Sequence, residues 1–315
     1  MENNLLFSVC VITYNQEKYI SQALDSILNQ EHGFPYEIVI GDDCSSDNTQ
    51  YIIEEYAQKY SDIIRPIYNT KNLGIIKNYF NVIGHCSGKY IMECAGDDWW
   101  LPGKVKKQID FMEANPDVGM CYGKAQIYKN GKKTSGSFGE KRESFKELLY
   151  KGNVIPAVTV CFRREIYEHY ANEIEPEKQN WLMEDYPMWL YFAHESKVKF
   201  LNTVSAAYRV LENSASHSTD IQKKLSFAKS SYELRLFFAG RYKESLPVWD
   251  EEKELFNIYY YQLLDSYTHK KAAFFYDSYL NLHKKSMRER IIIFVSRNFV
   301  LFKVFYFFAW MKNIF

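Results

Sequence analysis

The chain has 315 residues and a mass of 37.4 kDa, which is enough for one large core and an appendage. Lysine and arginine together number 39, as do aspartate and glutamate, so the formal net charge is zero. This balance excludes the strongly basic field typical of nucleic-acid-binding proteins, and we expect no nucleic-acid partner.

A first strand is predicted over residues 7–12, and it runs directly into the polar residues Thr13, Tyr14 and Asn15. Apolar residues then recur at helical spacing over 20–28. The sequence therefore predicts a strand, a polar loop and a helix in succession.

The pattern is repeated in a second strand over 36–40, which ends in the polar stretch 41–49 before another helical pattern. Open α/β sheets bind ligands beyond the carboxyl ends of their strands, so the two polar loops are candidates for one crevice. The alternative is that each loop supplies only turn or helix-capping residues.

The most informative stretch follows the third strand, over 90–92, where Asp97 and Asp98 are adjacent. Acids at the end of a buried strand are costly unless they bind a cation or a polar ligand. Their oxygens suit a hard divalent ion such as Mg²⁺ or Mn²⁺, which indicates phosphate chemistry. The alternative is a loop that only caps the next helix.

Taken together, these motifs resemble the family 2 glycosyltransferases, which have the nucleotide-diphospho-sugar transferase (GT-A) fold. The matching segments are 8–15, 22–30, 37–49, 72–74, 96–104 and 181–190. The resemblance covers about residues 5–217 and implies an α/β fold: a GT-A (Rossmann-like) mixed sheet flanked by helices, with a C-terminal helical appendage.

The resemblance also implies roles for individual residues. Thr13, Tyr14 and Asn15 would form part of the nucleotide pocket, and the Asp43 carboxylate would bind the base. Asp97 and Asp98 would hold the divalent metal at the diphosphate. Asp185 resembles the general base that deprotonates the acceptor hydroxyl, and Glu184 would position it.

Two departures from the family pattern concern the donor site. The family often carries an acid two positions before the metal-binding aspartate, where this chain has Ala95. It also tends to carry an Arg-Asn pair facing the diphosphate, where this chain has Lys77 and Asn78. Lysine keeps the charge but loses the bidentate fork of arginine.

Three further cations are candidates for the diphosphate or the acceptor. Arg163, followed by Arg164, ends a strand-like run over 154–164 and could meet an acceptor phosphate, the alternative being a solvated pair. Arg209 and His217 resemble the segment that closes over the diphosphate, the alternative for His217 being a surface residue.

We predict three parts in the chain: a GT-A catalytic domain over 1–217, a helical extension over 218–286 and an amphipathic tail over 287–315. The catalytic domain would comprise a nucleotide-sugar half over about 1–100 and an acceptor half over about 101–217. The aromatic residues of the extension are read as core rather than as a sugar-stacking platform.

The tail combines a basic cluster at 283–290 with apolar runs that are interrupted by charged residues. This pattern favours a helix lying in the membrane interface, the alternative being a helix packed on the protein or a dimer partner. The six cysteines lack metal-type spacing and the N-terminus lacks a signal-peptide pattern. We therefore expect free thiols and a cytoplasmic enzyme at the inner face of the cell membrane.

The predicted activity is an inverting, metal-dependent hexosyl transfer from a nucleotide diphosphate donor, a UDP-sugar, to a hydroxyl of a glycan or lipid-linked glycan in surface polysaccharide biosynthesis. One alternative is a non-catalytic nucleotide-sugar-binding module. Another is a sugar-nucleotide pyrophosphorylase, which is disfavoured because no Gly-rich phosphate loop follows the first strand.

Overall fold

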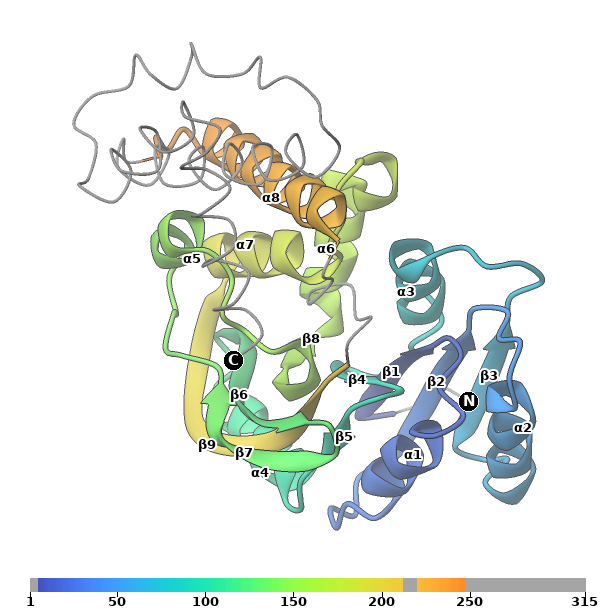
Figure 1. The fold of residues 1–315 in the computed structure, drawn as a ribbon. Coiled ribbons are helices and arrows are strands. Elements are labelled where there is room, and N and C mark those ends of the chain that lie inside the picture. Colours follow the sequence, from blue (N-terminus) through green and yellow to red (C-terminus); the bar gives the residue numbers. More distant parts are fainter. Residues whose placement is uncertain (1–4, 212–219, 247–315) are drawn as a thin grey trace. The chain divides into compact units, whose positions relative to one another are not determined.

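The computed structural model describes residues 5–211 and 220–246 (Figure 1). The chain divides into two compact units, residues 1–218 with 230–246 and residues 219–229 with 247–315. The predicted tail over 287–315 and most of the predicted extension lie outside the described residues. The fold and the site below belong to the first unit.

The first half of this unit alternates strands and helices. Its elements are β1 (Phe7–Thr13), α1 (Ile20–Leu28), β2 (Tyr36–Asp42), α2 (Thr49–Lys59), β3 (Ile64–Tyr68), α3 (Ile75–Ile83) and β4 (Tyr90–Ala95). All pairings among these four strands are parallel, in the order β3-β2-β1-β4. Their carboxyl ends therefore lie at one edge of the sheet.

The second half adds mixed strands and further helices. Its elements are β5 (Trp99–Trp100), α4 (Lys104–Ala114), β6 (Val118–Lys129), β7 (Lys132–Phe138), α5 (Phe145–Lys151), β8 (Cys161–Arg163), α6 (Arg164–Ile174), α7 (Asp185–Glu195) and β9 (Lys197–Val210), with short 3₁₀ helices at Ala157–Thr159 and Pro176–Lys178. Of helix α8 (Ile221–Arg241), residues 230–241 belong to this unit. The full order is β3-β2-β1-β4-β8-β6-β9-β5, with β7 paired to β6. The predicted mixed α/β sheet is confirmed.

Two hydrophobic cores cover the two faces of the sheet. One includes residues of α3, α5, α6, α7 and the second half of α8, and the other includes residues of α1, α2 and α4. Figure 1 shows α3, α6 and α7 on one side of the strands and α1 and α4 on the other. Side chains alternate along β4, so Ile91 faces the first core whereas Met92 and Cys94 face the second.

The strand-like run over 154–164 forms a strand only at Cys161–Arg163. Pro156 lacks a backbone N–H for a sheet ladder, and a 3₁₀ turn follows it at Ala157–Thr159. The Thr159 hydroxyl donates to the Pro156 carbonyl at 2.8 Å, which closes the turn. The prediction was therefore wrong for residues 154–160.

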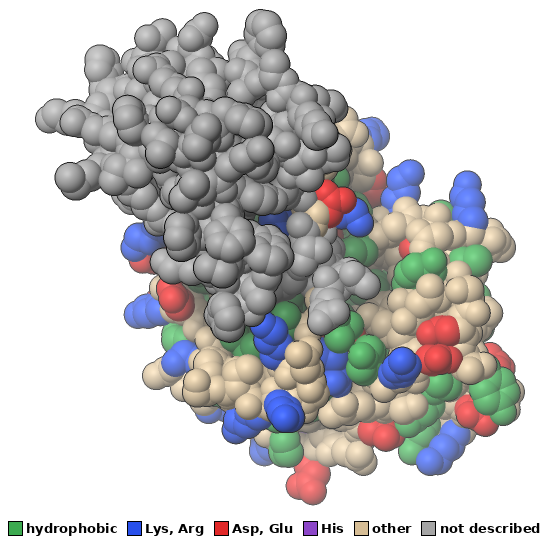
Figure 2. Space-filling view, viewed as in Figure 1, with side chains coloured by type: hydrophobic (Ala, Val, Ile, Leu, Met, Phe, Trp, Pro, Cys, Tyr) green, Lys and Arg blue, Asp and Glu red, His purple; other side chains and the backbone are tan. Residues whose placement is uncertain are grey.

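Among the described residues, no helix has both the length and the apolar character needed to cross a bilayer. Basic and acidic side chains are interspersed over the described surface in the view of Figure 2, as the equal numbers of the two charge types suggest.

Candidate active site

The loops that follow β1 and β2 are joined by hydrogen bonds. Asn15, which has a positive φ of 52°, donates its N–H to the Ser45 hydroxyl at 2.8 Å and accepts the Ser46 N–H at 2.8 Å. The Gln16 N–H donates to the Thr49 hydroxyl at 2.7 Å. These bonds fix the predicted nucleotide-pocket segment, in which Tyr14 is 47% exposed.

Asp43 is buried below these loops and anchors the segment that leads into α3. One carboxylate oxygen accepts the Leu73 N–H at 2.8 Å and the Asn69 side-chain amide at 3.0 Å, and the other accepts the Gly74 N–H at 2.8 Å. A carboxylate has about four acceptor positions, so roughly one remains for a ligand.

Asp97 and Asp98 follow β4 at the same edge of the sheet. Asp98 is buried, and its Oδ1 accepts the backbone N–H of Arg209 at 2.8 Å. Burial, and next the charge of Asp97, raise the pKa of Asp98 well above its usual value. Burial also raises the pKa of Asp97. A divalent cation would relieve both the burial cost and the mutual repulsion of this pair.

In the described part of the chain, no group of three or more His, Cys, Asp or Glu side chains is arranged to hold a metal. Two carboxylates nevertheless fit Mg²⁺ or Mn²⁺, because such ions commonly take their other ligands from water and substrate phosphates. Ala95, at the position where the family often has an acid, contributes no ligand side chain.

Gly96 lets the aspartate loop approach the end of β1. A Cβ atom built on Gly96 would lie 2.4 Å from the Gln16 side-chain oxygen and 2.8 and 2.9 Å from Oγ1 and Cβ of Thr13. The Gly96 N–H donates to the Ile12 carbonyl at 3.0 Å, which holds the loop in this position. The absence of a side chain at residue 96 therefore sets the spacing between the Thr13–Gln16 segment and the Asp97–Asp98 pair.

Arg209 fastens the end of β9 to the same loop. Its guanidinium donates to the Asp97 carbonyl and to the Gln22 side chain, each at 2.8 Å. It also lies 4.4 Å from the ring centre of Tyr19 and 4.7 Å from that of Trp99. Burial raises the pKa of both aspartates, and the positive charge of Arg209 opposes this rise and so favours their ionised forms.

A second acidic pair lies where α7 begins. Asp185 accepts the Asn153 side-chain amide at 2.9 Å and the Tyr186 N–H at 2.6 Å. Burial raises the pKa of Asp185, and these bonds oppose the rise. Burial and the charge of Asp185 raise the pKa of Glu184 to about 7. The pair can therefore hold a proton near neutral pH, which is the range a general base requires.

Glu93 is a site residue that the sequence reasoning missed. It lies inside β4, is 6% exposed, and accepts the Tyr79 hydroxyl at 2.5 Å. Burial raises its pKa to about 8, the Tyr79 bond opposes the rise, and the charges of Glu184 and Asp185 add to it. An acid within an otherwise apolar strand was the available signal. The strand thus links the two acidic sites.

The remaining predicted residues are placed as follows. Lys77 is exposed on the first turn of α3. Arg163 is bound to the carbonyls of Val118, Met112 and Asn115, and it pairs with the first residue of β4, at the end opposite Asp97. The guanidinium of Arg163 is therefore engaged by backbone carbonyls of the fold, and a substrate contact at Arg163 stays a prediction.

Arg164 is likewise engaged, with the Gly88 carbonyl and with Glu168. His217 lies outside the described residues.

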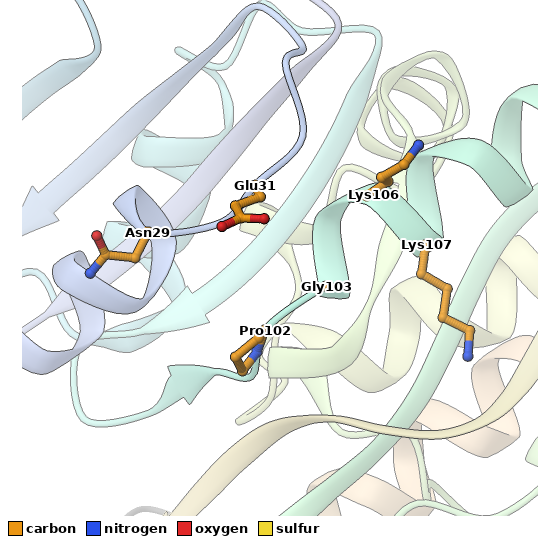
Figure 3. Close-up of a pocket in the computed structure, with 6 residues that line it drawn as sticks. All are labelled: Asn29, Glu31, Pro102, Gly103, Lys106 and Lys107. Atoms are coloured by element: carbon orange, nitrogen blue, oxygen red, sulfur yellow. The ribbon is translucent and has the colours of Figure 1, made fainter.

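A hollow of about 580 Å³ lies between the end of α1 and the start of α4, and Figure 3 shows its lining. It is lined by Asn29, Glu31, Pro102, Gly103, Lys106 and Lys107. None of the predicted site residues lines it, so we do not assign the substrate to this hollow.

Comparison with known proteins agrees with this geometry. The model of Glycosyl transferase family 2 matches residues 8–171. An uncharacterised protein of Mycobacterium tuberculosis is 36% identical over 50% of this chain and 47% of its own length. The match thus spans about half the length of that relative.

Two relatives match over more of their length. An uncharacterised glycosyltransferase of Haemophilus influenzae is 26% identical, with 93% of this chain and 97% of that protein covered. The Escherichia coli UDP-Glc:alpha-D-GlcNAc-diphosphoundecaprenol beta-1,3-glucosyltransferase WfgD is 25% identical, with 68% of this chain and 81% of that protein covered.

Solved structures with the same fold include S. aureus TarS in complex with UDP, with a TM-score of 0.57, 19% identity, and 93% of this chain and 79% of that chain covered. Mannosyltransferase PcManGT from Pyrobaculum calidifontis in complex with GDP-Man and Mn²⁺ has a TM-score of 0.57 and 15% identity, with 98% and 84% covered. The family model spans more than half of the chain, and these structures share its fold. The chain therefore belongs to glycosyl transferase family 2.

Proposed function

We propose that this chain is an inverting glycosyltransferase that transfers a hexose from a nucleotide diphosphate donor, a UDP-sugar, to a hydroxyl of a glycan or lipid-linked glycan. The observation that carries this proposal is the position of two acidic pairs at one strand. Asp97 and Asp98 follow the end of β4, and Asp185 and Glu184 interact electrostatically with Glu93 inside it. Such a reaction needs one acidic site for the leaving group and another for the attacking hydroxyl.

The donor would bind at the carboxyl edge of the parallel strands. Thr13, Tyr14, Asn15 and Asp43 would hold the nucleoside, and Lys77 would approach the diphosphate. Asp98, with Asp97, would hold Mn²⁺ or Mg²⁺, which supplies positive charge to the departing nucleotide diphosphate. Arg209 would keep the aspartate loop in place through its bond to the Asp97 carbonyl.

Asp185 would act from the acceptor side. Its carboxylate takes the proton of the acceptor hydroxyl while the hydroxyl oxygen attacks the anomeric carbon and the bond to the nucleotide diphosphate breaks. One displacement inverts the anomeric centre. Asn153 orients the carboxylate through the 2.9 Å bond, and Glu184 supports it. A base in this position is typically worth a rate factor of roughly a hundred to ten thousand.

The relatives support the choice of substrates. The name of WfgD states a UDP-Glc donor and a diphosphoundecaprenol-linked acceptor, and TarS was solved with UDP. PcManGT was solved with GDP-Man and Mn²⁺, which supports a divalent ion but widens the range of donors to test. These names support our proposal of a role in surface polysaccharide biosynthesis.

A lipid-linked acceptor would require the enzyme to work at a membrane surface, and we propose that the sequence over 287–315 attaches it peripherally to the inner face. Deleting residues 288–315 should release the protein from sedimenting anionic liposomes while donor hydrolysis persists. Full-length protein that never sediments with these liposomes would contradict the attachment.

The experiment that tests the function is a donor panel on the full chain. Nucleotide release is measured from UDP-glucose, UDP-galactose, their N-acetyl forms and GDP-mannose, with Mn²⁺, Mg²⁺ or EDTA. We expect one UDP-sugar to be hydrolysed slowly in a metal-dependent manner without acceptor. Binding without any turnover would favour the non-catalytic module, and synthesis of a nucleotide sugar from a nucleoside triphosphate and a sugar 1-phosphate would favour the pyrophosphorylase.

Two variants separate the roles of the acidic sites. Asp98→Asn should abolish turnover and weaken metal-dependent donor binding. Asp185→Asn should lose turnover by a factor on the order of a hundred or more while donor binding stays near wild type. Asp117→Asn, an exposed aspartate paired with Lys197, is the matched control and should change neither quantity. Full turnover in Asp185→Asn would move the base elsewhere.

A further inference from the structure

Glu93 and Tyr79 form a buried pair that the reaction described above leaves unused. The Tyr79 hydroxyl of α3 donates to Glu93 Oε1 at 2.5 Å and lies 3.6 Å from the sulfur of Met188. Met188 is three residues after Asp185 on α7, so both lie on the same side of that helix. Tyr79 therefore connects Glu93 to the helix that begins with the proposed base.

The position of Glu93 in β4 is also informative. Alternation along the strand places Ile91, Glu93 and Ala95 on one face, and Ile91 and Tyr79 belong to the core that includes α7 residues. Residue 95, where the family often has an acid, is alanine, and Glu93 lies on the same face about 6.6 Å earlier along the strand. A buried carboxyl at this depth is costly and calls for a compensating role.

Charged and titratable groups approach Glu93 from four elements. They are Tyr79 of α3, Cys10 of β1, Lys104 of α4, and Glu184 and Asp185 at the start of α7. Burial raises the pKa of Glu93 to about 8, and that of Glu184 is raised to about 7. At neutral pH the three carboxyls therefore carry fewer than three negative charges.

We propose that Glu93 is a positioning residue of the acceptor site: its carboxyl, held by the Tyr79 hydroxyl that also contacts Met188 of α7, acts on the proposed base Asp185 through the charge that it carries. The role of Asp185 in this inference rests on the proposed function. In the chemical step the acceptor proton goes to Asp185, and no atom passes to or from Glu93. The link between the two is electrostatic, since like charges in a buried site raise each other's pKa.

The first test needs no activity. Difference infrared spectra of wild type and Glu93→Gln isolate the carbonyl band of the protonated Glu93 carboxyl. This band should disappear as the pH rises through about 8. In Asp185→Asn the loss should occur at lower pH, because a neighbouring negative charge is gone. In Tyr79→Phe it should occur at higher pH, because a bond to the ionised form is gone.

Absence of the band at neutral pH, or an unchanged titration in Asp185→Asn, would overturn the proposal. If Glu93→Gln does not fold, carbon NMR of labelled glutamate carboxyls in wild type, Asp185→Asn and Tyr79→Phe follows the same shifts.

The second test uses transfer rates from about pH 6 to 9. The ratio of the wild-type rate to the Glu93→Gln rate should be constant at low pH and rise by about threefold as Glu93 ionises, because base strength enters the rate. Donor affinity should not change. A merely structural residue would lower the rate equally at every pH, so a flat ratio refutes the proposal.

Glu37→Gln is the matched control, since Glu37 is buried near the start of β2 and bound to Ser8, Ser87 and Arg65. Its rate ratio should be flat. Failure of the wild type to turn over any donor would refute the proposed function instead, while the infrared titration would still decide whether Glu93 and Asp185 are coupled.

Discussion

Replacing Gly96 with alanine adds a single methyl group where the aspartate loop meets β1. The new carbon would lie 2.9 Å from Cβ and 2.8 Å from Oγ1 of Thr13, and 2.4 Å from the Gln16 side-chain oxygen. The Gln16 amide can turn away, although it would then lose its 2.7 Å bond from the Thr13 hydroxyl. Thr13 cannot move in the same way, because it is buried and its backbone pairs with Asp42 of β2 and accepts the Asp43 N–H at 3.0 Å.

The size of the effect follows from these distances. Carbon atoms prefer separations of about 3.5–4.0 Å, so the loop has to move by about 0.6–1.1 Å. Overpacking of this kind typically costs about 1–3 kcal/mol. For a domain of this size the loss corresponds to a melting temperature lower by about 2–12 °C. Because the same movement displaces Asp97 and Asp98 from the nucleotide-pocket segment, turnover should fall by on the order of a hundredfold.

The assay compares Gly96→Ala with Gly136→Ala. Gly136 is an exposed residue of β7, and an added Cβ would have no neighbour closer than 3.9 Å. Thermal unfolding and metal-dependent binding of UDP are measured for both variants. Gly136→Ala should match wild type in binding, whereas Gly96→Ala should lose both stability and affinity. Wild-type stability and affinity in Gly96→Ala would refute the packing argument, and a loss of stability alone would refute the assignment of the donor site.

Three further predictions concern polar contacts. Arg209→Lys keeps the charge but cannot make both guanidinium bonds, to the Asp97 carbonyl and to Gln22. Calorimetry should therefore show about tenfold weaker binding of UDP with Mn²⁺. Unchanged binding would exclude a role for the paired guanidinium bonds. Asn153→Ala removes a hydrogen bond that opposes the burial-induced rise in the pKa of Asp185. The acid limb of the pH–rate profile should therefore move to higher pH while donor affinity stays constant. A shift of this limb to lower pH would contradict the argument. Burial alone would raise the pKa of Glu37, but hydrogen bonds from Ser87, Ser8 and Arg65 outweigh it and lower this pKa in the folded protein. The ionised Glu37 therefore stabilises the fold above the unfolded-state pKa, and this stabilisation is lost as the pH falls through the folded-state pKa. Urea denaturation should therefore show that Glu37→Gln is less stable than wild type at neutral pH and that the difference shrinks in acid; an equal difference at both pH values would refute the linkage.

Sequence patterns predicted strands β1, β2 and β4 of the parallel half but not β3, an edge strand that contains Arg65 and Pro66. Strands β1, β2 and β4 are buried apolar runs, and polar residues mark where they end. The order of the mixed strands could not be predicted, because it depends on pairings between residues far apart, such as those of β6 with β9.

Side-chain partners were harder to predict than elements. Arg163 looks solvent-exposed in sequence because arginine usually is, yet three backbone carbonyls bind it. Glu93 was overlooked because a strand was expected to stop before it, whereas β4 continues to Ala95. Both residues are polar groups whose partners come from distant parts of the chain, and local pattern carries little information about such contacts.

The strand order has a consequence for biosynthesis. β5 directly follows the aspartate loop in the chain, but its partner in the sheet is β9, whose residue Arg209 lies 111 positions after Asp98. A nascent chain that has emerged only as far as β5 therefore contains both aspartates without the strand that fixes them. Formation of the proposed donor site must wait until the ribosome has extruded β9, although the parallel strands can pair earlier. Until β9 is available, the backbone N–H and C=O groups with which β5 pairs to β9 have no partner strand.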